Sequence, residues 1–344
     1  MNATTYKSRL PQDLGSIVTL CTKRPRNPEN LAIHPKAVEL AEKLVGITGW
    51  DAQVFFSQDG ATANEAALKL SRLTGRKRVV AALGAFHGRA MGALAMTGQP
   101  VKREPFKPLI KGVKHVPYGD VARLKRAVSR RTAMVILEPI MGEAGVVVPP
   151  PGYLRAAREI CDRTGALLVL DCVQTGMGRT GDFFGFEHEG ISPDIITIAK
   201  GLGGGLPLGA VLARGRAATL FTPGSHGTTF GGNPIACAAA NQVLKEIDAK
   251  SMLATNAAKG ALLRNLLSPI SGVVEVRGRG LLIGVSVKES RAKSLAENLL
   301  HRGFLVNAAN DDVIRIAPAF IITQPEIIRF ARAFAEACEE IYDV

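Results

Sequence analysis

Two charged residues each stand directly after a short apolar run. Asp171 follows ALLVL (166–170), and Lys200 follows IITIA (195–199) and precedes the glycine-rich GLGGG (201–205). Short runs of Leu, Ile and Val are typical of strands that are buried on both faces of a parallel sheet. The carboxyl ends of such strands form the crevice in which open α/β sheets bind ligands. We therefore expect both charged groups to face one ligand site.

This pair of residue types suits one kind of cofactor. A lysine amine forms an imine with an aldehyde only when it is neutral, and burial at a strand end lowers its pKa because desolvation disfavours the charged form. A carboxylate such as that of Asp171 keeps the nitrogen of a pyridine ring protonated, so that the ring can accept electrons. For either residue alone, the alternative is a solvated charge at a strand end. Together, Lys200 and Asp171 favour a cofactor held at two points.

A candidate phosphate site lies earlier in the chain, in QDGATANEAALKL (58–70). Gly60 and Ala61 stand at the start of a predicted helix, where the free N–H groups and the helix dipole favour an anion. The alternative is an ordinary helix start that the Asp59 side chain caps. The residues alone leave both interpretations open.

Two glycine-rich stretches are interpreted as loops. GMGRTG (176–181) fits the glycine fingerprint of dinucleotide-binding sites, which opens a helix in such proteins. The following DFFGFEHEG (182–190) has no helical period, so we do not expect a dinucleotide site. The Gly/Pro-rich stretch 139–152 is interpreted as a loop beside the cofactor.

Apolar runs alternate with helical patterns over residues 53–240, which predicts an α/β fold with a parallel or mostly parallel sheet between helices. The predicted strands are 53–56, 78–82, 113–116, 133–138, 166–170, 195–199 and 209–213. The predicted helices cover 62–73, a stretch after His87, 119–130 and 153–164. The last hundred residues predict a smaller α+β unit, with helical patterns over 235–268, two strands in 273–287, a helix over 290–302, a strand at 313–317 and a final helix from Pro325, which Thr323 caps.

Composition narrows the classes of partner. The chain has 344 residues, and its 43 Lys and Arg against 30 Asp and Glu leave a net charge of +13. The basic residues are scattered and not interleaved with aromatics, so the charge favours anionic substrates over nucleic acid. No apolar run approaches the ~18 residues of a membrane span. The five cysteines form no metal-ligand spacing, which predicts no metal site and reduced thiols in a cytoplasmic protein.

Eight segments in order carry a family resemblance, beginning near residue 40: VFFSQDGATANEAALKLSRLTG, AFHGRAMGALAMTGQP, LEPIMGEAGVVVPPPGY, LLVLDCVQTGMGRTG, PDIITIAKGLGGGLPLGA, HGTTFGGNP, VRGRGLLIG and VIRIAP. The chain resembles the class-III (subgroup II) aminotransferases, in particular the acetylornithine and ornithine aminotransferases. This resemblance implies pyridoxal 5'-phosphate as cofactor and the fold-type I architecture of that class. It implies an atypical, shortened N-terminal segment (1–38), a large cofactor-binding domain (39–245) and a small α+β domain (246–344).

The resemblance also implies which residues hold the cofactor. Lys200 is the Schiff-base lysine and proton shuttle, Asp171 pairs with the ring nitrogen, and Gln174 lies near the ring hydroxyl. The backbone at the helix start holds the phosphate, an aromatic ring stacks on the cofactor, and a threonine of the partner subunit closes the phosphate site. The full cofactor-binding set is Gly60, Ala61, Phe86, Asp171, Gln174, Lys200 and Thr229.

Four further residues are implied at the substrate. Arg89 binds the α-carboxylate with the bidentate fork of a guanidinium, and Thr228 lies at the substrate. Arg315 holds a carboxylate of 2-oxoglutarate, and Glu143 covers Arg315 when a monocarboxylate amino donor is bound. The alternative for Glu143 and Arg315 is a structural ion pair.

The implied function is transfer of the ω-amino group of N-acetylornithine to 2-oxoglutarate in arginine biosynthesis, giving glutamate and a semialdehyde, by a homodimer with its site at the interface. The alternatives are an ornithine, succinyldiaminopimelate or 4-aminobutyrate aminotransferase, another reaction on the same cofactor, and a catalytically impaired relative. Three features depart from the family pattern. Cys172 replaces a glutamate, Asp59 replaces a serine, and the family's N-terminal motifs have no counterpart in residues 1–30.

Overall fold

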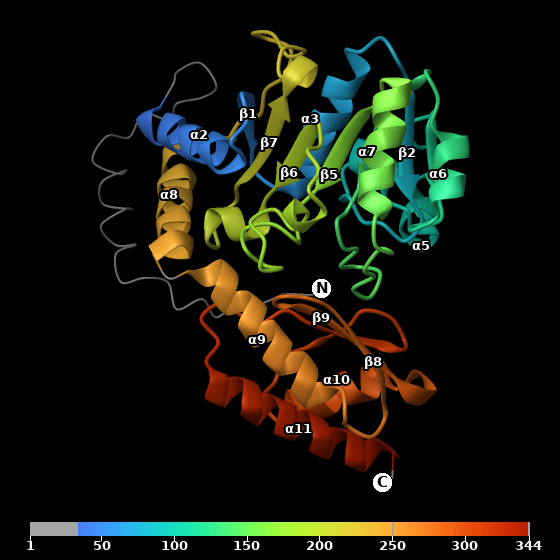
Figure 1. Ribbon diagram of the computed structural model, residues 1–344, viewed down its shortest axis with the longest axis vertical. Helices are drawn as coiled ribbons and strands as arrows, with labels where there is room; N and C mark the ends of the chain where they lie inside the picture. Colours follow the sequence, from blue (N-terminus) through green and yellow to red (C-terminus); the bar gives the residue numbers. More distant parts are fainter. Residues whose placement is uncertain (1–33, 250, 343–344) are drawn as a thin grey trace.

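The computed structural model describes residues 34–249 and 251–342, and its larger sheet has seven strands in the order β1-β7-β6-β5-β4-β2-β3 (Figure 1). The pairs among β2 to β6 are parallel, while β7 runs antiparallel to both of its neighbours. The predicted mostly parallel sheet is therefore confirmed. The strands are β1 (Ala52–Ser57), β2 (Arg78–Ala82), β3 (Val113–Val116), β4 (Thr132–Leu137), β5 (Leu167–Asp171), β6 (Ile195–Ile198) and β7 (Gly209–Arg214).

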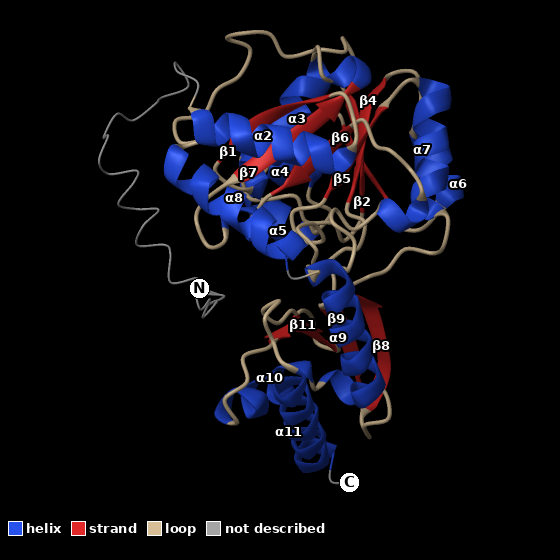
Figure 2. Ribbon diagram, turned by 60° about the vertical axis from the view of Figure 1, so that its left-hand side comes forward, coloured by secondary structure: helices blue, strands red, loops and turns tan. Residues whose placement is uncertain are grey.

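Alternation of side chains along the strands divides the core between the two faces of this sheet. On β5, Leu168 and Leu170 belong to the apolar cluster that includes residues of α7 (Tyr153–Thr164). Leu167 and Val169 belong to the opposite cluster, with α3 (Gly60–Arg72). Figure 2 shows the red strands between blue helices. The other helices of this part are α2 (Pro35–Thr48), α4 (Met91–Met96), α5 (Pro100–Arg103), α6 (Val121–Ala127) and α8 (Pro234–Ala249).

A smaller antiparallel sheet, in the order β10-β11-β9-β8, lies below the large one in Figure 1. It packs with three helices around its own apolar cluster. The predicted Thr323 cap is confirmed, because the Glu326 backbone N–H donates to the Thr323 hydroxyl at 3.4 Å. The elements are β8 (Val273–Arg279), β9 (Leu282–Val287), β10 (Asn307–Ala308), β11 (Val313–Ile316), α9 (Met252–Leu267), α10 (Ala292–His301) and α11 (Gln324–Tyr342).

The stretch predicted as helical over 235–268 contains a break in the structure. The helical pattern over 235–268 forms two helices, α8 and α9, and Ser251 between them has a left-handed φ of 45°. The predicted domain boundary at residue 245 falls inside α8 and stays a prediction. The atypical segment 1–38 lies almost wholly outside the described residues, which begin at residue 34.

The loop over 139–152 joins the large sheet to the small one. Arg277 of β8 donates hydrogen bonds to the Val146 carbonyl at 2.9 Å and to the Gly145 carbonyl at 2.7 Å. A small apolar cluster of Ile140, Val146 and Leu282 lies at the same junction. These contacts fix the loop that follows β4 and bring β11 of the small sheet to the carboxyl ends of the large-sheet strands.

Candidate active site

Asp171 and Lys200 lie at neighbouring carboxyl ends, as the sequence predicts. Asp171 is the last residue of β5, and Lys200 follows β6 by two residues. The two strands pair in parallel, with Asp171 opposite Thr197. Asp171 also stabilises the charged form of Lys200 electrostatically. The topology of the sheet therefore brings the two charges into one site.

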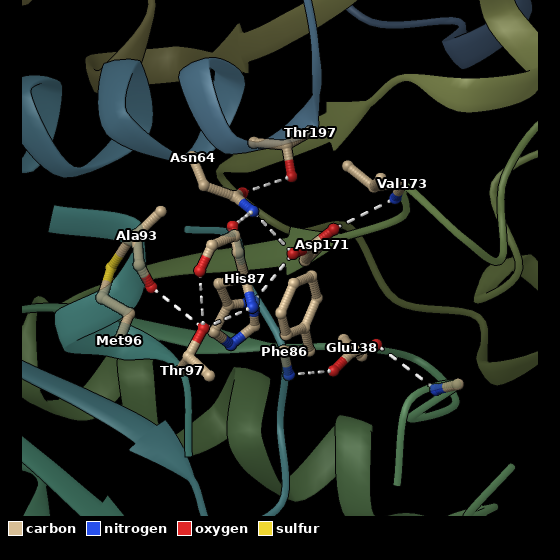
Figure 3. Close-up of polar contacts among 12 residues, drawn as sticks. Asn64, Phe86, His87, Ala93, Met96, Thr97, Glu138, Asp171, Val173 and Thr197 are labelled. Carbon is tan, nitrogen blue, oxygen red and sulfur yellow. Dashed lines mark hydrogen bonds and ion pairs between the residues drawn. The ribbon is translucent and has the colours of Figure 1, made fainter. Parts of the chain in front are cut away.

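Three donors fix the Asp171 carboxylate, which is 3% exposed (Figure 3). Its Oδ2 accepts a hydrogen bond from Asn64 Nδ2 at 2.7 Å and lies 2.7 Å from His87 Nδ1. Its Oδ1 accepts from the Val173 backbone N–H at 3.1 Å. Asn64 is held in turn, since it donates to the His87 carbonyl at 2.8 Å and accepts from the Thr197 hydroxyl at 2.8 Å. The carboxylate is therefore held in one orientation by partners that are themselves hydrogen-bonded.

The backbone at Lys200 is strained, with a φ of 51° in a region that favours glycine. Such conformations cost about 1–3 kcal/mol and cluster at functional sites. The residue keeps accessible surface, yet the protein around it desolvates the amine and lowers the pKa of Lys200. Glu143, Asp171 and Glu138 act in the opposite direction. The predicted lowering is confirmed, and it favours the neutral amine that a reaction with an aldehyde requires.

Glu138 is a site residue that the sequence reasoning missed. It follows β4 directly and is 5% exposed, and its Oε1 accepts a hydrogen bond from the Phe86 backbone N–H at 2.9 Å. Burial raises the pKa of Glu138 to about 7; Asp171 adds to this rise, while His87 and Lys200 oppose it. The rule that singled out Asp171 and Lys200, a charge directly after an apolar run, applies equally to AMVILE (133–138) and would have found it.

An ion pair joins the two sheets beside Lys200. Arg315 Nη1 of β11 donates to Glu143 Oε1 at 2.5 Å, across 172 residues of sequence. Gln174 Nε2 donates to the same Glu143 oxygen at 3.3 Å, and Arg315 Nη1 lies 3.4 Å from Gln174 Oε1. Burial raises the pKa of Glu143, but the charge and hydrogen bond of Arg315 outweigh it and lower the pKa overall. The three residues that the resemblance implies at the substrate and ring hydroxyl thus contact one another.

Phe86 is half-buried and has two cations over its ring. The guanidinium carbon of Arg89 lies 5.9 Å from the ring centroid, and Lys102 Nζ lies 4.7 Å from it. The resemblance implies a role for Phe86 and Arg89 but none for Lys102. Sequence reasoning had no local signal for Lys102, because it reaches the ring only through the path of the chain between β2 and α5.

At the start of α3, the capping interpretation is confirmed, while the phosphate interpretation stays a prediction. Asp59 is the N-cap, and its Oδ1 accepts from the Thr62 backbone N–H at 2.8 Å. The N–H groups of Gly60 and Ala61 are the first two of the helix and lack an intrahelical partner, as at any helix N-terminus. A Cβ at Gly60 would lie 2.7 Å from Val173 Cγ1, so only glycine fits this approach to the β5 end.

Thr228 and Thr229 lie beside the residues at the start of α3. They line a pocket of 240 Å³ together with Gln58, Thr62 and His226. The Thr228 hydroxyl donates to the Gln58 side chain. The two threonines therefore lie next to the start of α3 in their own chain.

Cys172 packs in the core and contributes no group to the site. It is 1% exposed within the apolar cluster between the sheet and α7, because neighbouring residues at a strand end point to opposite faces. Burial raises the pKa of its thiol well above the usual range. Cys21 lies outside the described residues. Within the described ranges, no group of His, Cys, Asp or Glu has the arrangement of a metal site, and no helix is long and apolar enough to cross a membrane.

These residues fit pyridoxal phosphate. The amine of Lys200, with its lowered pKa, suits the aldehyde, and the oriented Asp171 carboxylate suits the ring nitrogen. The Phe86 ring suits stacking on the cofactor, and the N-terminus of α3 suits the phosphate. The site therefore offers one group for each of these parts of the cofactor. The site and the mostly parallel sheet together define a cofactor-dependent enzyme of the fold-type I class.

Comparisons with known proteins give the family. The class-III aminotransferase family matches residues 28–338. The acetylornithine aminotransferase of Mycolicibacterium smegmatis is 54% identical over 306 residues, which cover 88% of this chain and 78% of that protein. The corresponding protein of Streptomyces coelicolor is 55% identical over 293 residues, 84% of this chain and 73% of the other. The ornithine aminotransferase structure from Toxoplasma gondii has a TM-score of 0.91 at 28% identity, covering 97% of this chain and 83% of that one.

The chain belongs to the class-III aminotransferase family. It is an aminotransferase, and its cofactor is pyridoxal phosphate. The fold-type I architecture and the resemblance that the eight motifs carry are confirmed.

Proposed function

We propose that this enzyme transfers the ω-amino group of N-acetylornithine to 2-oxoglutarate, giving glutamate and a semialdehyde, as a step of arginine biosynthesis in the cytoplasm. The observation that carries the proposal is the Arg315–Glu143 pair beside Lys200. The identity of 50–55% to acetylornithine aminotransferases of several bacteria supports the choice of amino donor.

Each cofactor contact is assigned to a residue of the described site. Pyridoxal phosphate supplies a ring that accepts electrons from the bond being broken at the substrate's amino-bearing carbon. Asp171, held by Asn64 and His87, keeps the ring nitrogen protonated. Lys200 Nζ would hold the aldehyde end of the cofactor and would carry the proton at the substrate carbon, a role that its lowered pKa favours.

The remaining cofactor contacts position the ring. Phe86 stacks on its face, Gln174 hydrogen-bonds near its hydroxyl, and the N–H groups of Gly60 and Ala61 bind the phosphate. Glu138 holds the Phe86 backbone in place through the 2.9 Å hydrogen bond. Asp59 places a carboxylate on the same helix start, which opposes the phosphate charge.

The Arg315–Glu143 pair explains how one site takes two kinds of substrate. With a monocarboxylate donor, Glu143 neutralises Arg315, so no unpaired cation faces the apolar part of the substrate. With 2-oxoglutarate, a substrate carboxylate replaces Glu143 on Arg315. Arg89 binds the single carboxylate of the donor and the second carboxylate of 2-oxoglutarate, since it is exposed at the same site and its guanidinium can bind in a bidentate manner.

We also propose a homodimer in which each subunit completes the other's site with Thr228 and Thr229. These threonines lie on a surface loop, and the next residue, Phe230, is 58% exposed. An exposed aromatic beside polar side chains is typical of an interface.

The test is a pair of half-reactions followed by the visible absorption of the lysine-linked cofactor. N-acetylornithine should remove this absorption, and 2-oxoglutarate should restore it; Lys200→Ala should show neither change. Equal second-order rate constants for ornithine, 4-aminobutyrate or succinyldiaminopimelate would contradict the choice of donor. A wild-type protein that binds the cofactor without any donor response would support a catalytically impaired relative instead.

A further inference from the structure

Lys102 lies at the active site without any role so far. It belongs to α5, a short helix that follows Pro100, and its Nζ lies 4.7 Å from the centroid of the Phe86 ring. The residue is half-buried, whereas lysines are among the residues most often left in water. The Phe86 ring thus has Lys102 and Arg89 over it at once.

Neither of these two cations has an anionic partner. Among residues 34–249 and 251–342, no carboxylate forms an ion pair with Arg89 or Lys102, whereas Arg315 at the same site is paired with Glu143. Partial burial lowers the pKa of Lys102, Glu143 opposes this, and the charges of Arg89 and Arg315 add to the lowering. The positive charge of Arg89 disfavours the charged form of Lys102, and an anion that contacts both cations would relieve that repulsion.

A contact with the aromatic ring does not account for this arrangement by itself. A lysine over a phenyl ring at a partly exposed position gains only a small stabilisation. The desolvation of the ammonium and the repulsion by two arginines oppose that gain. A substrate carboxylate would add the missing counter-charge, and a compact ammonium on a flexible stem can follow carboxylates of different length.

We propose that Lys102 binds the carboxylate of the substrate jointly with Arg89, beside the Phe86 ring. Arg89 supplies a fixed bidentate contact, and Lys102 supplies a movable point charge. Lys102 is therefore a specificity residue for amines and oxo acids that carry a carboxylate. The inference rests on the proposed function only in that the substrates of the enzyme carry this group.

The experiment uses the cofactor-loaded enzyme and the variants Lys102→Met and Lys102→Arg. The ligand without an amine is glutarate, whose dissociation constant is measured by its effect on the cofactor absorption. The ligand without a carboxylate is butylamine, which is followed in single-turnover reactions so that slow amines are measurable. Glutamate and N-acetylornithine are followed in the same way. Lys107→Met is the matched control, because Lys107 lies five residues away, is exposed and pairs with Glu104 at 2.7 Å.

Lys102→Met should raise the glutarate dissociation constant, and the concentrations of glutamate and N-acetylornithine at half-saturation, by about five- to tenfold. Its effect on butylamine should be at least fivefold smaller, and Lys102→Arg should recover most of the loss. Lys107→Met should leave all four values within twofold. If butylamine showed an equal loss, or if only the affinity for the cofactor fell, the proposal would be overturned in favour of a contact with the ring or the cofactor. Unchanged glutarate binding would also overturn it.

The test of Lys102 gives an answer whichever amino donor the enzyme prefers. If the wild-type enzyme reacts with glutamate but not with N-acetylornithine, the proposed function fails. The comparison of glutarate and glutamate with butylamine then still decides the role of Lys102.

Discussion

Replacing Asn64 by leucine tests how the Asp171 carboxylate is held. Leucine has a similar volume but no polar atoms, and the Asn64 side chain is 1% exposed. The change removes three hydrogen bonds of 2.7, 2.8 and 2.8 Å and leaves the His87 carbonyl and the Thr197 hydroxyl without that partner. A buried polar group that loses its partner costs about 1–3 kcal/mol. We therefore expect the free energy of unfolding to fall by about 3–5 kcal/mol.

Asn64→Leu should also lower the rate of the reaction. Asp171 keeps His87 and the Val173 N–H but loses one of its three donors, so its orientation toward the ring nitrogen is less well defined. We expect Asn64→Leu to lower kcat by about tenfold, which corresponds to ~1.4 kcal/mol in the barrier. Urea denaturation of the cofactor-free protein gives the stability, and single-turnover reaction with glutamate gives the rate.

Asn256 provides the matched control. It is fully buried in α9 and donates one hydrogen bond to the Gly178 carbonyl at 3.0 Å, and its Oδ1 has no partner among the residues that the structure describes. Asn256→Leu should cost about 1–2 kcal/mol and leave the rate unchanged. If Asn64→Leu stayed within ~1 kcal/mol of the wild type, or if both variants slowed the reaction equally, the argument for a carboxylate clamp would be refuted.

Three further predictions follow from single carboxylates. Asp59→Ser keeps a helix cap but removes a charge opposed to the phosphate, so cofactor affinity should rise about fivefold by fluorescence titration. Asp120→Ser, at the cap of α6, should leave that affinity unchanged, and equal effects would refute the reasoning. The pKa of Glu138 is raised from 4.5 to about 7, so its contribution to stability is present below pH 4.5 and is lost as the pH rises to about 7. Glu138→Gln should therefore remove up to about 3 kcal/mol of this pH dependence in denaturation of the cofactor-free protein, whereas parallel profiles would contradict it. Glu143→Gln leaves Arg315 unneutralised, so the ratio of kcat/KM for N-acetylornithine to that for glutamate should fall at least tenfold, and an unchanged ratio would argue for a purely structural pair.

Local sequence patterns were sufficient where a residue's role follows from its own strand. Short apolar runs predicted β5 and β6, and the rule for strand ends placed Asp171 and Lys200 together. Glu138 obeys the same rule and was missed only because the rule was not applied to β4. Asn64 carried a weaker signal, an amide on the alanine-rich face by which α3 packs on the sheet.

Contacts between distant segments had no local signal. Arg315 and Glu143 meet because β11 of the small sheet reaches the loop after β4, and only the family resemblance anticipated the pair. His87 reaches the site from irregular chain and Lys102 from the single short turn of α5, so no sequence period fixes the direction of either side chain. Burial of Asp171 and the positive φ of Lys200 likewise depend on the complete fold.

The central claim is that Lys200 holds the cofactor opposite Asp171. Borohydride reduction of the cofactor-loaded enzyme, followed by proteolysis and peptide mass spectrometry, tests it most directly. We predict a pyridoxyl group on Lys200 and on no other lysine, and its loss after prior addition of excess glutamate. A pyridoxyl group on a different lysine, or an unmodified Lys200 in an enzyme that still carries out the half-reactions, would contradict the account.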